Sequence, residues 1–328
     1  MTVLSDVLAC FGGSPAGAPL YLADLTQWHS WHHSRGSLPQ GWQDYSPAQV
    51  AHELGTPLWW SVRPWRPELP GVEITTTETD NEREICYETE AGTIVERWSL
   101  GPDGDWWHTE YPLKSARDLP AVRRLVEARS YVVDAVGWEQ QRSALGDVGI
   151  LAMELPQTPY SDLLHTILGW SEGLMLLMGD EREPILELLA VMEAKHRTAM
   201  VELARLPGAI ALAPDNLDGQ FIPPSAFRQH MTDSYRLAAE VLHAHDKRLI
   251  VHIGGMCRHL LAPLAATGVD GVEGVAGPPQ SDAPLSMARE KVGANFLLWG
   301  GHSAGSAVGY PRRGGVSGGG RGGDRAGA

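Results

Sequence analysis

Cysteine is scarce in this chain of 328 residues, which contains three: Cys10, Cys86 and Cys257. They are too few and too scattered for a disulfide framework, and their spacing matches no compact zinc motif. This pattern predicts a protein of a reducing, cytoplasmic compartment.

Basic residues are also in short supply, because 26 Lys and Arg stand against 40 Asp and Glu, for a formal net charge of −14. Such a balance disfavours non-specific binding to nucleic acid or to an anionic membrane. No window approaches the roughly 18 to 20 apolar residues that span a bilayer. The N-terminus has no basic segment before its apolar residues and makes a poor signal peptide. We therefore expect small-molecule or protein partners, with no nucleic acid and no membrane.

What the chain does contain is a succession of short apolar runs separated by helical patterns, which is typical of repeated strand and helix units. The runs are short enough to be buried parallel strands, which need not alternate because helices cover both faces. Helices are predicted from Phe227 to Leu242, from Met256 to Ala266 and from Ala283 to Val292. The predicted strands are Thr56–Val62, Gly149–Leu155, Ile210–Ala213, Leu249–Ile253, Val269–Val275 and Phe296–Trp299.

The first hundred residues carry two further structural signals. Ser46 and Pro47 stand where the cap and first turn of a helix are expected, and this helix runs to Leu54. Gly71–Leu100 alternates apolar and polar residues around a turn at Ala91-Gly92. That alternation predicts a β-hairpin or a small antiparallel excursion.

A short segment near the N-terminus, residues 20–45, concentrates tryptophan and histidine. Histidines so close together suggest a metal site, but only His29 and His33 have i, i+4 spacing, and no carboxylate stands where a zinc motif would place it. An amphipathic cap, whose indole and imidazole rings pack on the main body or line its entrance, is the favoured alternative. Arg35 is a candidate for anion recognition, although a solvated arginine is the plainer interpretation.

Polar side chains stand where several of the predicted strands end. In barrels and open sheets of the α/β class, the loops at the carboxyl ends of the strands build the active site. We therefore expect these side chains to meet at one mouth of the sheet. They are Glu154, Asp215, Asn216, Asp218, His252 and Glu273.

Asp215, His252 and Glu273 are the candidates among them for acid–base chemistry. His252 and Glu273, with Asp215, could also hold zinc or another divalent ion, because imidazole and carboxylate are ligands for both. Each residue has a plainer alternative. A histidine at a strand end is often a hydrogen-bonded structural residue, Asp215 could cap the next loop, and Glu273 could be a surface acid.

Several stretches together resemble the uroporphyrinogen decarboxylase superfamily, which includes the corrinoid-dependent methyltransferases. They are PDNLDGQFIPPSAFRQH, HAHDKRLIVHIGG, LAATGVDGVEG and AREKVGANFLLWGG, preceded by VEITTTETDNEREICYETEAGTIVERW and EYPLKSARDLPAVRRLVE. The resemblance spans about residues 20–302 and implies a (β/α)8 barrel with an N-terminal cap and a hairpin insertion at about residues 71–100. It is closer to the methyltransferase-like members than to the true decarboxylases.

The chain departs from this family at two places. Members that bind zinc to activate a thiol have a His-x-Cys pair after the strand that corresponds to Leu249–Ile253. Here His252 is present, Gly254 occupies the Cys position, and Cys257 is expected in the following helix. The true decarboxylases have an aspartate in the strand that corresponds to Thr56–Val62, and TPLWWSV contains no acid.

The resemblance implies a methyltransferase that moves a methyl group between a small molecule and a corrinoid carried by a partner protein, with zinc as a possible metal at His252 and Glu273. The first alternative is a cofactor-free decarboxylase of uroporphyrinogen or a related acid, as in porphyrin biosynthesis. The second is a truncated chain that binds a partner or has no activity. Substrate contacts are expected from Arg35, Trp60, Glu154, Asn216 and Asp218.

The last residues, 303–328, change character abruptly, with ten glycines, four arginines and almost nothing apolar. Such a segment cannot bury enough surface to fold, so it is expected to be disordered. An RGG-like nucleic-acid arm is one interpretation, but a single short run on an acidic protein supports it weakly. The preferred interpretation is a barrel over residues 1–302 that is incomplete at its C-terminus, because the reading frame is lost near His302.

Overall fold

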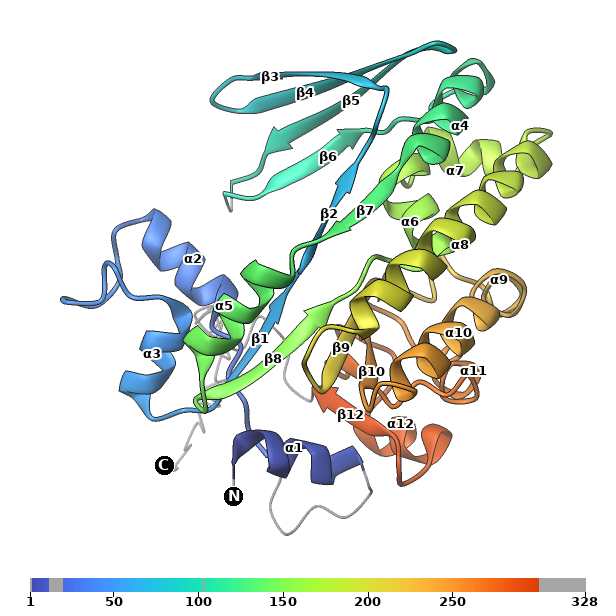
Figure 1. Ribbon diagram of the computed structural model, residues 1–328. Coiled ribbons are helices and arrows are strands. Elements are labelled where there is room, and N and C mark those ends of the chain that lie inside the picture. The colour runs from blue at the N-terminus through green and yellow to red at the C-terminus, as the bar shows by residue number, and fades with distance from the viewer. Residues whose placement is uncertain (1, 12–19, 103, 301–328) are drawn as a thin grey trace, which may run out of the picture.

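The computed structural model describes residues 2–11, 20–102 and 104–300. Its centre is a six-stranded sheet with the order β1-β8-β9-β10-β11-β12, in which every neighbouring pair is parallel (Figure 1). Each of the predicted strands is present. Their bounds are β1 (Leu58–Val62), β8 (Gly149–Glu154), β9 (Ile210–Leu217), β10 (Arg248–Ile253), β11 (Gly271–Val275) and β12 (Leu297–Gly300).

The parallel sheet curls so far that its two edge strands meet across the inside. The ring centroids of Trp59 in β1 and Trp299 in β12 lie 4.5 Å apart. Helix α1 (Val3–Phe11) packs against the same inner face through Val7 and Phe11. The result is a half-barrel of six strands in the described chain, where the sequence predicted an eight-stranded one that is incomplete. The buried inner-face core consists of Val7, Phe11, Trp59, Ile150, Ala152, Ile210, Leu212 and Ile250.

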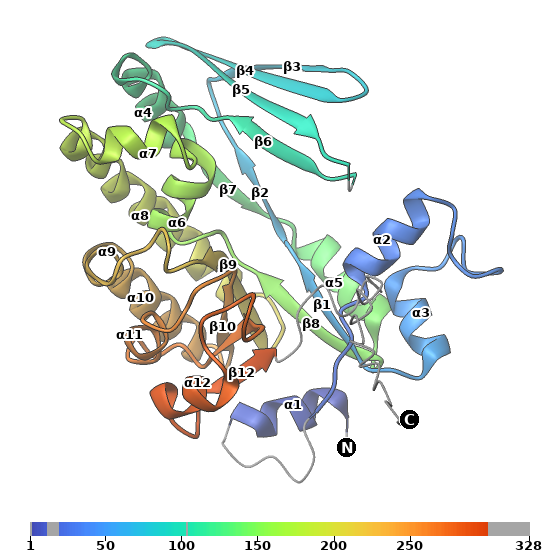
Figure 2. The ribbon, with the colours of Figure 1, turned by 180° about the vertical axis from the view of Figure 1, so that it is seen from behind.

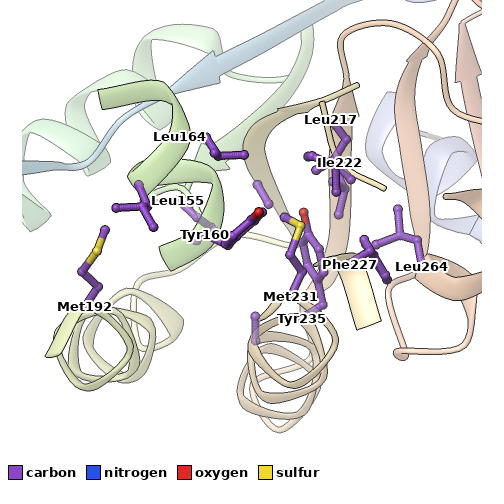
Figure 3. Close-up of a cluster of buried hydrophobic side chains, with 14 of the residues drawn as sticks. Leu155, Tyr160, Leu164, Met192, Leu217, Ile222, Phe227, Met231, Tyr235 and Leu264 are labelled. Carbon is purple, nitrogen blue, oxygen red and sulfur yellow. The ribbon is translucent and has the colours of Figure 1, made fainter. Parts of the chain in front are cut away.

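Helices cover the outer face of the half-barrel (Figure 2). Strand β10 shows why both faces are apolar: Leu249 and Val251 belong to the outer core, whereas Ile250 between them belongs to the inner one. Figure 3 shows how side chains from these helices interlock with Leu217 at the end of β9. The helical segments after β8 are α6 (Pro159–Asp162), the π-helical segment η2 (Leu163–Leu168), α7 (Glu172–Leu177), α8 (Arg182–Ala204), α9 (Pro224–His230), α10 (Thr232–His243), α11 (Leu261–Ala265) and α12 (Leu285–Val292).

A second, antiparallel sheet projects beyond the half-barrel (Figures 1 and 2). Its strands come between β1 and β8 in the chain. The predicted hairpin forms its centre, as β4 paired with β5, and the turn lies at residues 90–91. A further strand on each side makes it a sheet of four strands, which the sequence did not predict. Its strands are β3 (Glu73–Glu78), β4 (Glu82–Thr89), β5 (Gly92–Leu100) and β6 (Trp106–Glu110).

Two further strands and three helical segments connect this sheet to the half-barrel. Strands β2 and β7 pair antiparallel as a separate two-stranded ribbon. Helix α4 packs on α8 and on β5, so it joins the two parts of the molecule. These connecting elements are β2 (Trp65–Glu68), η1 (Ala116–Asp118), α4 (Leu119–Ala128), β7 (Ser130–Val133) and α5 (Ala135–Leu145).

Near the N-terminus, α2 (Thr26–Ser34) and α3 (Pro47–Leu54) follow α1. The predicted start of α3 is confirmed, because the Ser46 side chain accepts a hydrogen bond from the Gln49 backbone N–H in a capping box. In the described part of the chain, no helix is both long and apolar enough to cross a membrane. The predicted disordered tail and the predicted loss of frame, residues 302–328, lie outside the described residues.

Two predicted helices differ from the observed ones. The helix expected from Met256 begins only at Leu261 in the structure. Asp282 holds the preceding loop open by accepting hydrogen bonds from the backbone N–H groups of Cys257 and Arg258. Cys257 therefore lies before the helix and not in it. The helix expected from residues 227–242 is divided at Met231 into α9 and α10.

Candidate active site

Three of the predicted site residues lie on the inner face of the half-barrel, near the carboxyl ends of their strands: His252 and Glu273 on the neighbouring strands β10 and β11, and Glu154 on β8, which β9 separates from β10. Alternation along each strand places Glu154, His252 and Glu273 on the same face as the inner core. His252 is the register partner of Glu273, and Glu273 is the register partner of Trp299. We call this group of Glu154, His252, Glu273 and Trp299 the mouth. It is the arrangement that the sequence predicted for parallel strands.

The centre of the mouth is a hydrogen bond of 2.5 Å between Nδ1 of His252 and Oε2 of Glu273. The two side chains are 36% and 24% exposed, so a small molecule can reach them. Burial lowers the pKa of His252, but the hydrogen bond and negative charge of Glu273, with smaller contributions from Asp215 and Glu154, outweigh it and raise this pKa above its ordinary value. In the described chain, Nε2 of His252 has no hydrogen-bond partner.

Two interruptions of the strand ladders flank this pair. Val251 is the register partner of Ala213 and Ile253 of Leu217, so the three residues 214–216 of β9 stand opposite His252 alone. A second register shift lies between β11 and β12, next to Glu273. Bulges of this kind re-aim side chains and are common beside active sites. Pattern reasoning could not predict them, because it ended the strand of β9 at Ala213.

Asp215 lies behind the mouth and has no exposed surface. It accepts hydrogen bonds from the backbone N–H of Thr158 at 2.7 Å, from Oγ1 of Thr158 at 2.9 Å, and from the Tyr235 hydroxyl. Tyr235 is among the buried side chains in Figure 3. Burial raises the pKa of Asp215 to about 6, although these hydrogen bonds favour its charged form. Asp215 thus ties the segment after β8 to β9. It affects His252 only through its negative charge.

Asn216 is turned toward the mouth by an unusual backbone. Its φ of 49° lies in the left-handed region, which asparagine tolerates better than most residues. The carboxamide lies over Gly254, where a Cβ would stand 1.7 Å from Oδ1 of Asn216. The place of a side chain at position 254 is therefore already filled by Asn216. In the described chain, this carboxamide has no hydrogen-bond partner.

Asp218 holds the loop that follows β10. Its carboxylate accepts a hydrogen bond from the backbone N–H of Gln220 at 2.8 Å and another from Met256 at 3.3 Å. It also fills the space beside Gly255, where a Cβ would stand 2.2 Å from Oδ2. Asp218 thereby fixes the segment that leads away from His252, and these contacts occupy the carboxylate.

Glu154 forms an ion pair with Arg63, whose Nη2 lies 2.7 Å from Oε1. Arg63 follows β1 directly, and its guanidinium carbon lies 4.9 Å from the ring centroid of Trp65. Sequence reasoning missed Arg63. The signal was available, since Arg63 directly follows the predicted strand Thr56–Val62 just as the chosen acids follow theirs.

The other two predicted substrate contacts lie elsewhere. The guanidinium carbon of Arg35 sits 3.2 Å from the ring centroid of Trp31, at the end of α2. Trp60 packs against a small outer cluster that includes Ala51 and Leu145, on the face of β1 opposite Trp59. No contact in the described chain joins Arg35 or Trp60 to the mouth.

The residues present do not fit a zinc site. The described residues hold no group of three or more His, Cys, Asp and Glu side chains that could bind a metal ion. Position 254 has no side chain, and Nδ1 of His252 is already bonded to Glu273. Cys257 is fully buried, with its Sγ 3.3 Å from Oγ of Ser281. Zinc normally needs at least three protein ligands around one point, and these side chains do not supply them.

Comparison with known proteins supports the fold. No family model matches the sequence, and no curated protein matches it. Among solved structures, a methyltransferase from Methanosarcina mazei matches with a TM-score of 0.51 and 15% sequence identity, over 91% of this chain and 82% of that one. At this level of identity the likeness concerns the fold alone.

Proposed function

We propose that this protein is a methyltransferase that removes a methyl group from a small molecule at the mouth of the half-barrel and passes it to a corrinoid carried by a partner protein. The observation that carries the proposal is the hydrogen-bonded pair of His252 and Glu273 on the inner face. The fold it shares with a methyltransferase is consistent with this activity.

His252 is the general acid of this reaction. When a methyl group leaves a small molecule, the bond between carbon and the heteroatom breaks and its electron pair stays on the heteroatom. Nε2 of His252 donates a proton to that atom, so the demethylated product departs neutral. A reduced corrinoid supplies the nucleophile that takes the methyl group. Glu273 fixes the imidazole through Nδ1 and keeps Nε2 protonated and directed at the substrate.

The decarboxylase alternative is less well supported by the mouth. A decarboxylase of a polycarboxylic acid needs cations for the substrate carboxylates. Arg63, the arginine beside Glu154, is already paired with that residue. Arg35, the candidate for anion recognition, is stacked on Trp31 away from the mouth.

The proposal is tested by mixing the purified protein with methylated small molecules and free reduced cobalamin, and following methylcobalamin by its absorbance. We expect the wild-type chain to transfer the methyl group and His252→Gln to lose about 10²- to 10⁴-fold in rate, because the proton donor is missing. His245→Gln is the matched control. His245 is an exposed histidine on the same part of the chain whose Nδ1 bonds the Val241 carbonyl.

Circular dichroism and the thermal midpoint must show that both variants are folded. Equal rates for wild type and His252→Gln would contradict the proposal. Release of carbon dioxide from uroporphyrinogen, with no methyl transfer, would establish the decarboxylase instead.

A further inference from the structure

Asn216 combines three properties that a purely structural residue would not need. Its backbone is held in a left-handed conformation, with φ at 49°. Its side chain is exposed, and in the described chain the carboxamide has no hydrogen-bond partner. Non-glycine residues with strained backbones persist where the surroundings impose them, and they cluster at functional sites. Here the surroundings are the bulge of residues 214–216 and the buried anchor of Asp215.

Gly254 leaves the space that the Asn216 carboxamide fills. It follows His252 by two residues, so the two positions face the same side of the chain about 6–7 Å apart. The carboxamide of Asn216 lies over Gly254, with Oδ1 nearest to the glycine and Nδ2 farther away. The Asn216 carboxamide of β9 therefore lies over the position two residues after His252, on the side of the chain that His252 faces.

Two donors on the same side of the chain favour a substrate atom that has two lone pairs. An ether or alcohol oxygen has two and can accept from both Nε2–H and Nδ2–H, whereas a methylammonium nitrogen has none and a thioether sulfur accepts weakly. Loss of a methyl group also leaves a negative charge on that oxygen, which both donors stabilise more strongly than the neutral ether.

We infer that Asn216 orients the substrate at His252, that Gly254 is required to make room for it, and that the two donors restrict the substrate to a methylated oxygen. The inference rests on the proposed methyl transfer and specifies its substrate. In the reaction the carbon–oxygen bond breaks, the electron pair and the proton of His252 go to oxygen, and the methyl group goes to the reduced corrinoid.

The test compares four chains: wild type, Asn216→Gly, Gly254→Ala and the double variant. Methyl donors are methanol and 2-methoxyphenol for oxygen, trimethylamine for nitrogen and dimethyl sulfide for sulfur, each with reduced cobalamin. We expect transfer from an oxygen donor and a roughly tenfold lower kcat/KM in Asn216→Gly. Gly254→Ala should cause a similar loss because a methyl group there displaces the carboxamide. The double variant should match Asn216→Gly alone, because both changes remove the same contact.

Stability separates a substrate-orienting role from a structural one. Glycine tolerates a left-handed backbone, so Asn216→Gly should keep the thermal midpoint or raise it slightly. Gly254→Ala should lower the midpoint, and the double variant should recover it. Asp246→Gly is the matched control, because Asp246 also has a left-handed φ, 57°, but lies between α10 and β10 at the opposite end of the strands. It should leave methyl transfer unchanged.

Three results would overturn the inference. A wild-type kcat/KM in Asn216→Gly would show that Asn216 does not orient the substrate. A clear fall in the thermal midpoint of that variant would show that Asn216 has a structural role. Faster transfer from trimethylamine or dimethyl sulfide would refute the oxygen substrate while leaving the proposed function intact. Absence of transfer from every donor would contradict the proposed function itself, and the inference would fall with it.

Discussion

Among the described residues, two pairs of histidine and glutamate lie on neighbouring strands, one in the six-stranded sheet and one in the four-stranded sheet, and their environments shift the pKa of the histidine in opposite directions. At the mouth, His252 and Glu273 are 36% and 24% exposed and hydrogen-bonded, and the pKa of His252 is raised. In the antiparallel sheet, His108 and Glu96 are 8% and 10% exposed and 3.4 Å apart. There burial lowers the pKa of His108 to about 4.

The aromatic residues around His108 explain the difference. Its ring stacks on Trp98 at 4.1 Å between centroids and lies 3.9 Å from Tyr111. Glu96 accepts a hydrogen bond from Tyr87 at 2.8 Å, and burial raises the pKa of Glu96. Desolvation disfavours the charged form of both partners, so this pair is held near neutrality and serves packing. The same two residue types therefore give a histidine with a raised pKa only where solvent reaches them and a close contact joins them.

Among changes that test the comparison of the two pairs, the largest effect should come from neutralising the carboxylate of the pair at the mouth. In Glu273→Gln the His252 pKa should fall, because the charge that raised it is gone. An acid loses activity as the pH rises through its pKa, so the alkaline limb of the rate profile should move to lower pH. We expect a loss of about tenfold or more in methyl transfer on that limb. The measurement is the pH dependence of kcat/KM, together with an NMR titration of the imidazole.

Glu96→Gln is the matched control, since it makes the same change in the buried pair. It should leave the pH dependence of methyl transfer as in the wild type. An alkaline limb that stays in place in Glu273→Gln would show that His252 is not the titrating acid.

A smaller effect is expected on acid stability. His108 has a pKa of about 4 in the folded chain and an ordinary value near 6.5 when unfolded. The unfolded state therefore binds more protons between these values, and stability is lost as the pH falls through this window. His108→Phe keeps a flat ring against Trp98 but cannot take up a proton. It should remove about 1–2 kcal/mol of the acid-induced loss in the free energy of unfolding.

Urea unfolding at pH 7 and at pH 4.5 measures this difference. The comparison between the two pairs would fail if His108→Phe lost as much stability between these pH values as the wild type does. The fully buried His196, whose pKa burial also lowers to about 4, contributes to the same window and remains unchanged in the variant.

The smallest effect should come from the half-exposed ion pair of Arg63 and Glu154, in which Arg63 is 55% exposed. Exposed pairs contribute little, so Arg63→Gln should change the free energy of unfolding by no more than about 0.5 kcal/mol. It leaves the negative charge of Glu154, which faces His252, without a partner. The pKa of His252 should therefore rise slightly, and the alkaline limb should move to higher pH. A movement to lower pH would contradict this account of the charges at the mouth.

Much of the fold could be predicted because it depends on local patterns. The apolar run at Leu249–Ile253 became β10, Arg248–Ile253, since a run of that length with helices on both sides fits only a buried strand. Ser46 starts α3 through its own side chain. The start of α11 at Leu261 could not be predicted, because Asp282, which holds the preceding loop, is far along the chain.

The candidate site was predicted in part. The rule that polar residues at the ends of parallel strands converge placed Glu154, His252 and Glu273 together. It did not separate these residues from Asp215, which is directed to the outer face and buried under Tyr235. Asp215 and the residues of the mouth are separated by the bulge of β9. There Asp215 faces outward, and the next residue, Asn216, lies over Gly254. No periodicity in the sequence encodes that turn.

The sequence by itself determined the order of strands and helices and the positions of its acids and histidines, because apolar spacing and capping residues act over a few neighbours. Only the tertiary structure decided which histidine has a raised pKa. His108 and His252 both lie beside a glutamate, but one ring is enclosed by aromatic residues and the other opens into a half-barrel. That difference depends on packing between segments far apart in the chain, and so does the placement of Asn216 over Gly254.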